Sequence, residues 1–184
     1  MAVTSSASSR APASSWRSGA SLRKGMQMQA PEQIVPKKLA DYLDVLTRAV
    51  FQSGISWRVV EAKWPGTREA LHGFDPERLA DLTPDDVDRL AEDSRLIRNR
   101  RKIEATVANA QTMLDLDREY KGFKRYLGTF GDYDAVAADL IKRFKFLGGT
   151  GAYYFLHVVG EKVPTHEEWM AAHQPAAPGP RRRG

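Results

Sequence analysis

Cysteine is absent from the 184 residues, and this absence excludes several chemistries. The chain cannot form a disulfide or use a cysteine nucleophile, and a zinc site would need histidine and carboxylate ligands alone. No segment approaches the roughly 18 consecutive apolar residues of a membrane-spanning helix, and the N-terminus lacks the apolar stretch of a secretory signal. We therefore predict a cytoplasmic protein with no membrane contact.

Acidic residues are missing from both ends, 1–30 and 171–184. Seven of the 28 Lys and Arg residues lie there, so the 21 that remain face all 23 acidic residues and the body carries a formal charge of −2. Nucleic-acid binding must then rest on local patches. We predict a disordered Ser/Ala/Arg-rich arm over 1–30, with an organelle transit peptide as the alternative, one domain over 31–170 and a disordered basic tail over 171–184.

Strand-like alternation is missing as well, and helical spacing replaces it. Asp75 and Thr83 each precede a proline, which is typical of a helix start, and Ser56 and Asp132 are further candidate caps. Pro65 and Gly66 are expected to interrupt the helix after Ser56. The pattern predicts an all-α, single compact helical domain of about eight short helices. The first of them carries a regularly spaced apolar set, Leu39, Leu43, Leu46 and Val50.

A glycine-rich turn, Gly148-Gly149-Thr150-Gly151, separates two predicted helices. Glycines permit a positive φ and a close backbone approach, and the amides that open the next helix favour an anion. Lys145 and two further cations, Lys142 and Arg143, precede the turn. This arrangement favours phosphate binding, while the alternative is a flexible connection beside a solvated basic face.

The segment Gln52-Ser53-Gly54-Ile55-Ser56-Trp57 is the second informative element. With Gly54 at a loop tip, Ile55 would project as an apolar wedge and Trp57 would offer a flat face to a planar ligand. The alternative is that Ile55 and Trp57 simply belong to the core.

Over residues 36–160 the order of short motifs resembles the DNA-3-methyladenine glycosylase I family, within the helix-hairpin-helix DNA glycosylase superfamily. The matching stretches are Gln52 to Trp57, His72-Gly73-Phe74-Asp75-Pro76, Asp85 to Leu90 with Asp93, Leu96 to Arg100 with Lys102-Ile103, Asn109-Ala110, and Phe144 to Gly148 with Tyr153 and Phe155.

The resemblance implies a helix-hairpin-helix fold and hydrolytic release of alkylated purines such as 3-methyladenine from duplex DNA, with the damaged nucleotide flipped into a pocket. It implies base excision without strand cleavage, since no lysine occupies a recognised Schiff-base position. Base-binding candidates are Trp57, Gln52, Ala49 and Tyr153. DNA-binding candidates are Gly54, Ile55, Arg98, Arg100, Lys102, Lys145, Gly148, Gly149 and Thr150.

Three departures from the family stand out. The zinc site of the family uses two Cys and two His, so here no metal or other cofactor is expected. The N-terminal Tyr and His residues of the family have no counterpart in residues 1–30. The acidic residue expected eight positions before the pocket Trp is Ala49.

Another carboxylate would have to replace the missing acid. Asp44 lies five residues earlier, about 140° away around an ideal helix, so it cannot substitute. Glu167 and Glu168 follow the glycine turn by about twenty residues, near the spacing of a catalytic Asp in related glycosylases. They are equally typical of a helix N-terminus after Thr165. His166 and His173 lack further clustered ligands, so no metal site is predicted.

The leading hypothesis is a monomeric, nucleoid-associated base-excision glycosylase that acts on duplex DNA with alkylated bases. The first alternative is a non-catalytic protein that binds DNA lesions or DNA structures and has lost the pocket acid. A second alternative is a glycosylase for a bulkier adduct, which would use the space at Ala49.

Overall fold

The computed structural model describes residues 31–173, and every regular element within them is a helix. This confirms the all-α prediction for that range. The predicted arm and most of the predicted tail lie outside it, and the last helix continues to His173, past the predicted domain end at 170. In chain order the helices are α1 (Leu39–Gln52), α2 (Trp57–Ala70), the short 3-10 helix η1 (His72–Phe74), α3 (Pro76–Ala80), α4 (Pro84–Glu92), α5 (Arg100–Tyr120), α6 (Phe123–Leu127), α7 (Tyr133–Arg143), α8 (Gly149–Val158) and α9 (His166–His173).

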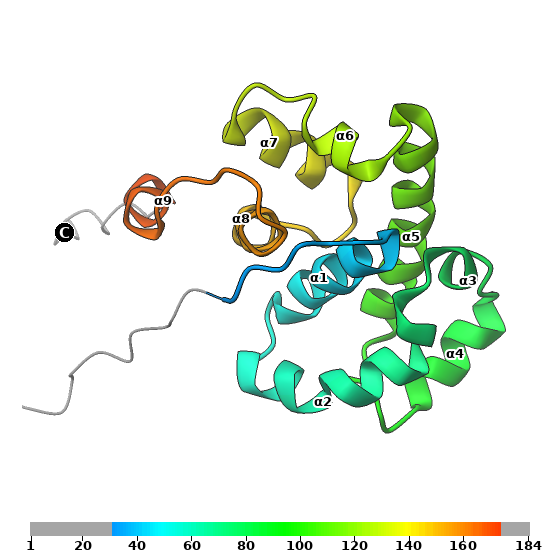
Figure 1. The fold of residues 1–184 in the computed structure, drawn as a ribbon. Helices are drawn as coiled ribbons and strands as arrows, with labels where there is room; N and C mark the ends of the chain where they lie inside the picture. Colours follow the sequence, from blue (N-terminus) through cyan, green and yellow to red (C-terminus); the bar gives the residue numbers. More distant parts are fainter. Residues whose placement is uncertain (1–30, 174–184) are drawn as a thin grey trace, which may run out of the picture. The chain divides into compact units, whose positions relative to one another are not determined.

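Helix α1 is the central element and contacts α2, α5 and α8 (Figure 1). Its apolar side chains Leu43, Leu46, Val50 and Phe51 are all fully buried. Residues on most sides of α1 are buried, so several neighbouring elements cover it. The C-terminal end of α1 is therefore held in a fixed position among its neighbours, and the candidate site begins there.

Three predicted helix starts are confirmed. Asp75, Thr83 and Asp132 each accept a hydrogen bond from a backbone amide in the first turn of the helix that follows. Such caps satisfy amides that have no partner within the helix. Ser56 precedes α2, but its side chain makes no capping hydrogen bond.

The prediction that Pro65 and Gly66 interrupt the second helix was wrong, because α2 runs through both. Pro65 removes one backbone donor, but the neighbouring Trp64 and Thr67 are buried, and their packing holds the turn helical. A Cβ atom at Gly66 would lie 3.1 Å from the Cβ of Arg95 and 3.2 Å from its carbonyl oxygen. Glycine at this position thus lets the segment after α4 approach α2 closely.

Candidate DNA and base-binding site

The turn between α1 and α2 has Gly54 at its tip. Gly54 is exposed and has a φ of 75°, a conformation that glycine adopts without strain. Ile55, which follows, is half-buried and packs against the apolar core. It therefore projects less than the sequence predicted.

Lys102 of α5 binds the backbone of this turn. Its Nζ atom donates hydrogen bonds to the carbonyl oxygens of Val50 (2.8 Å) and Phe51 (3.1 Å), and also to that of Ser53. Burial lowers the pKa of the ammonium group. The prediction that Lys102 contacts phosphate was wrong, because its three donors are used inside the protein.

Replacing Lys102 by Met should lower the free energy of unfolding by about 1–3 kcal/mol, because buried carbonyl oxygens at the end of α1 lose their donor. Urea unfolding followed by circular dichroism measures this change. Arg98→Met is the control, since Arg98 is exposed and has no ion pair with a described residue; its effect should stay within about 0.5 kcal/mol. Equal stabilities of the two variants would contradict the structural role of Lys102.

Trp57 is the first residue of α2, and its side chain is 45% exposed. It does not belong to the apolar core, which rules out the alternative that Trp57 is a core residue. Its ring meets Tyr154 of α8 edge to face, with centroids 5.6 Å apart. A planar ligand can therefore reach Trp57 from solvent while Tyr154 supports the ring from within the protein.

Tyr153 points into a different environment from Tyr154. Its ring lies 4.8 Å from that of Trp169 on α9, and its hydroxyl donates to the carbonyl of Pro164 at 3.1 Å. The prediction of Tyr153 as a base-binding residue was therefore wrong. It is Tyr154 that meets the Trp57 ring, and burial raises the pKa of its phenol, which stays protonated and neutral.

Ala49 and Gln52 lie one helical turn apart near the end of α1. Ala49 is buried where α1 meets α8, and a Cβ atom at Gly151 would lie 3.6 Å from the Ala49 Cβ. The Gln52 side chain lies beside the Tyr154 hydroxyl, but its Nε2 atom is buried without a hydrogen bond of normal geometry to any described residue. A buried amide group in this state calls for a structural or functional explanation.

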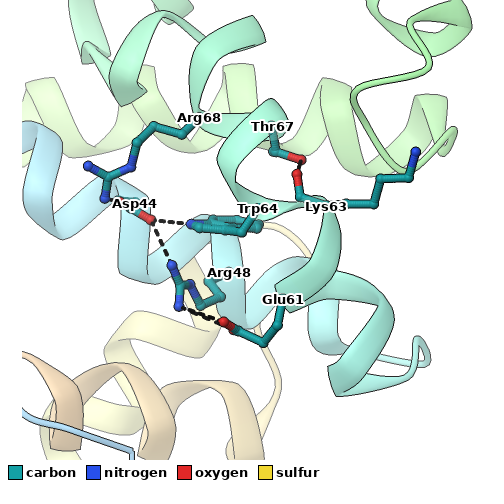
Figure 2. Close-up of polar contacts among 7 residues, drawn as sticks. All are labelled: Asp44, Arg48, Glu61, Lys63, Trp64, Thr67 and Arg68. Atoms are coloured by element: carbon teal, nitrogen blue, oxygen red, sulfur yellow. Dashed lines mark hydrogen bonds and ion pairs between the residues drawn. The ribbon is translucent and has the colours of Figure 1, made fainter.

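A network of charges joins α1 to α2 (Figure 2). Asp44 accepts a hydrogen bond from the indole Nε1 of Trp64 at 2.8 Å and pairs with Arg68. Arg48 lies 3.9 Å from Asp44 and 3.2 Å from Glu61, so it links the two carboxylates. The Asp44 carboxylate thus binds side chains of α2 and links the two helices. This agrees with the expectation that Asp44 does not replace the acid missing at position 49.

The hairpin between α7 and α8 is held by Asn109 of α5. The Asn109 side chain accepts from the Lys145 amide at 2.7 Å and donates to the Lys145 carbonyl at 3.1 Å. The positive φ of the hairpin falls on Phe146, at 57°, and on neither Gly148 nor Gly149. The expected role of the glycines in a left-handed turn was therefore wrong.

The glycines of the hairpin have two separate roles. A Cβ atom at Gly148 or Gly149 would meet nothing within 4 Å, so the start of α8 is open on that side. A Cβ atom at Gly151 would lie 3.0 Å from Leu147, which shows that Gly151 serves helix packing. Exposed Thr150 completes the open first turn of α8.

A family model described as methyladenine glycosylase matches residues 36–140, more than half of the chain. The chain belongs to this family. The DNA-3-methyladenine glycosylase of Haemophilus influenzae and DNA-3-methyladenine glycosylase 1 of Escherichia coli are each 32% identical over 130 residues, covering 59% of this chain and 70% of each relative.

Solved structures agree with the family assignment. A crystal structure of 3-methyladenine DNA glycosylase I has a TM-score of 0.62 at 28% identity, covering 69% of this chain and 81% of that one. The enzyme from Staphylococcus aureus has a TM-score of 0.63 at 25% identity, covering 70% of this chain and 80% of that one. The predicted helix-hairpin-helix glycosylase fold is thus confirmed, and the chain is a DNA glycosylase.

In this glycosylase the basic stretch at the start of α5 contains both paired and unpaired cations. Arg100 pairs with Asp88 and with Glu104, so its charge is balanced within the protein. Arg98 is exposed and has no ion pair with a described residue. Arg98 is therefore better suited than Arg100 to attract phosphate.

One of the two candidate acids of α9, Glu168, takes part in a helix cap. The Glu168 carboxylate accepts hydrogen bonds from the amide and hydroxyl of Thr165, each at 2.9 Å, and these bonds lower its pKa. This geometry favours the capping alternative for Glu168 over a catalytic one, and the neighbouring Glu167 is simply exposed.

No described helix has the length and apolarity needed to cross a bilayer.

Proposed function

We propose that this glycosylase hydrolyses the N-glycosidic bond of alkylated purines such as 3-methyladenine in duplex DNA, and that it acts as a monomer on nucleoid DNA. The observation that carries the proposal is the exposed Trp57 beside Tyr154, at the start of α2. The relatives are named for 3-methyladenine, and one solved neighbour, with a TM-score of 0.63, is a variant in complex with 3-methyladenine.

The chemistry suits an aromatic site. An N3-alkylated adenine carries a positive charge and is a good leaving group, so the enzyme mainly has to extrude the nucleotide, bind the base and admit water. The face of Trp57 attracts a delocalised cation. Gln52 lies beside the Tyr154 hydroxyl, and we propose that its amide donates to a ring nitrogen once the base is bound.

The main difference from the family at the proposed site is position 49, which is Ala in place of an acidic residue. Asp44 and Glu61 both pair with Arg48, so neither is a free carboxylate. We propose that the charge of the leaving group supplies most of the driving force, and that an acid at position 49 would only add to it. A carboxylate beside a delocalised cation in a dry site is favourable because both charge and hydrogen bonding stabilise it.

The decisive experiment incubates the purified protein with methylated duplex DNA and identifies released bases by chromatography. We expect the parent protein to release 3-methyladenine and Ala49→Glu to release it at least several-fold faster. Ala49→Gln is the matched control, because glutamine has nearly the size of glutamate without its charge. It should increase the rate of base release only slightly. Since Ala49 is buried, circular dichroism must show that both variants are folded. Binding of DNA without any base release by the parent or by Ala49→Glu would favour the non-catalytic alternative.

We also propose that folding needs no zinc. The described residues hold no group of three His, Asp or Glu side chains suited to a metal ion, and the chain has no Cys. Near the domain ends, Trp169 packs on Tyr153, and the Ile34 amide donates to the Val158 carbonyl at 2.7 Å. Metal analysis should find no stoichiometric zinc, and a chelator should leave Tm unchanged. About one zinc per chain would contradict this proposal.

A further inference from the structure

Phe146, in the hairpin between α7 and α8, combines exposure with an unfavourable backbone. Its side chain is 45% exposed and its φ is 57°, in the left-handed region that costs a residue with a Cβ atom about 1–2 kcal/mol. Phe74 also has a positive φ, of 60°, but it is fully buried and stacks on Trp64. Packing accounts for the conformation of Phe74, whereas Phe146 lies outside the apolar core.

The protein holds Phe146 in this position from both sides. Before it, the side chain of Asn109, which is 1% exposed, binds both the amide and the carbonyl of Lys145. After it, Leu147 is buried. Two fixed neighbours leave the Phe146 backbone little freedom, so its ring is presented to solvent by an ordered segment rather than by a loose loop.

The surroundings of the ring are positively charged. The Arg101 guanidinium lies over the Phe146 ring, 5.7 Å from its centroid. Arg101, Lys142 and Lys145 are exposed, and none of them forms an ion pair with a described residue. By contrast, Arg143 is paired with Asp139 at 2.7 Å. An exposed aromatic ring among unpaired cations fits a partner that offers phosphates together with apolar sugar and base surfaces, which is the chemistry of nucleic acid.

We propose that Phe146 is an apolar DNA contact of the hairpin, separate from the Gly54–Ile55 turn. Its ring packs against a sugar or base while Arg101 and Lys145 attract the adjacent phosphates. The proposal rests on the proposed function in one respect, namely that the hairpin faces duplex DNA. It assigns to Phe146 a positive contribution to DNA affinity and none to stability.

The test compares Phe146→Gly with Phe146→Tyr in thermal unfolding and in fluorescence anisotropy with duplex DNA containing an abasic-site analogue. Glycine removes the ring and accepts the positive φ, so we expect a Tm equal to or above that of the parent and a Kd raised about tenfold. The salt dependence of binding should not change, because no phosphate contact is lost. Phe146→Tyr keeps the ring and should bind like the parent.

Four other outcomes are separable. Parent-like affinity of Phe146→Gly would overturn the contact, and so would a Tm lowered by several degrees with affinity unchanged, which would make the ring structural. A parent protein that releases no base, while Phe146→Gly still loses affinity, would refute the proposed catalytic function and leave the contact standing. A parent protein that does not bind the duplex would overturn both.

Discussion

Gly149→Asp should weaken duplex DNA binding about 100-fold or more while the protein remains fully folded. A Cβ atom at Gly149 meets nothing within 4 Å, and an acidic side chain in the first turn of α8 suits the helix dipole. The same negative charge would stand where phosphate has to approach the open start of α8, and juxtaposed like charges cost several kcal/mol. At 1.4 kcal/mol for each tenfold change in Kd, a loss of two orders of magnitude follows.

Anisotropy with undamaged duplex and circular dichroism measure the two effects of Gly149→Asp separately. Gly149→Asn is the matched control, since it has nearly the same shape without the charge, and it should lose far less affinity. The difference between the two variants should shrink as salt is raised, because salt screens the repulsion. Equal affinities of parent and Gly149→Asp would place the phosphate elsewhere and contradict the hairpin assignment.

The local signals in the sequence were reliable where a short-range rule determines the structure. Asp75 and Thr83 form caps as predicted, because a cap depends only on residues a few positions away. Gly54 adopts its positive φ for a similar reason. Pro65 shows the limit of such rules, because buried Trp64 and Thr67 keep α2 continuous around it. Tertiary packing outweighed a local preference there.

The errors at the candidate site have a common physical cause, which is that side-chain direction depends on packing. Tyr153 and Tyr154 are adjacent on α8, about 100° apart around the helix, and the sequence does not show which one meets α2. Lys102 stands in a basic stretch but turns inward, because the carbonyls of Val50 and Phe51 lie within reach once the chain has folded. Neither contact is local in sequence.

Trp57→Ala should reduce the rate of base release by roughly 5- to 150-fold, which corresponds to the about 1–3 kcal/mol of one aromatic stacking interaction. The reason is that the exposed Trp57 ring is the surface on which the flipped cationic purine would stack, with Tyr154 behind it. Single-turnover release from methylated duplex measures the effect. Affinity for undamaged duplex should hardly change, because that DNA presents no flipped base to Trp57.

Trp57→Phe keeps an aromatic face and should retain most of the activity, whereas a purely structural role would predict a loss of stability in both variants. The exposed position of Trp57 argues against a structural role, since a side chain outside the core contributes little burial energy. If Trp57→Ala released base at the parent rate, the base would have to bind elsewhere. Trp57 contacts Tyr154 on α8, and Gln52 lies beside the Tyr154 hydroxyl. The proposed positions of Gln52 and Ala49 near the base depend on the base binding at Trp57, so that result would remove the reason for them.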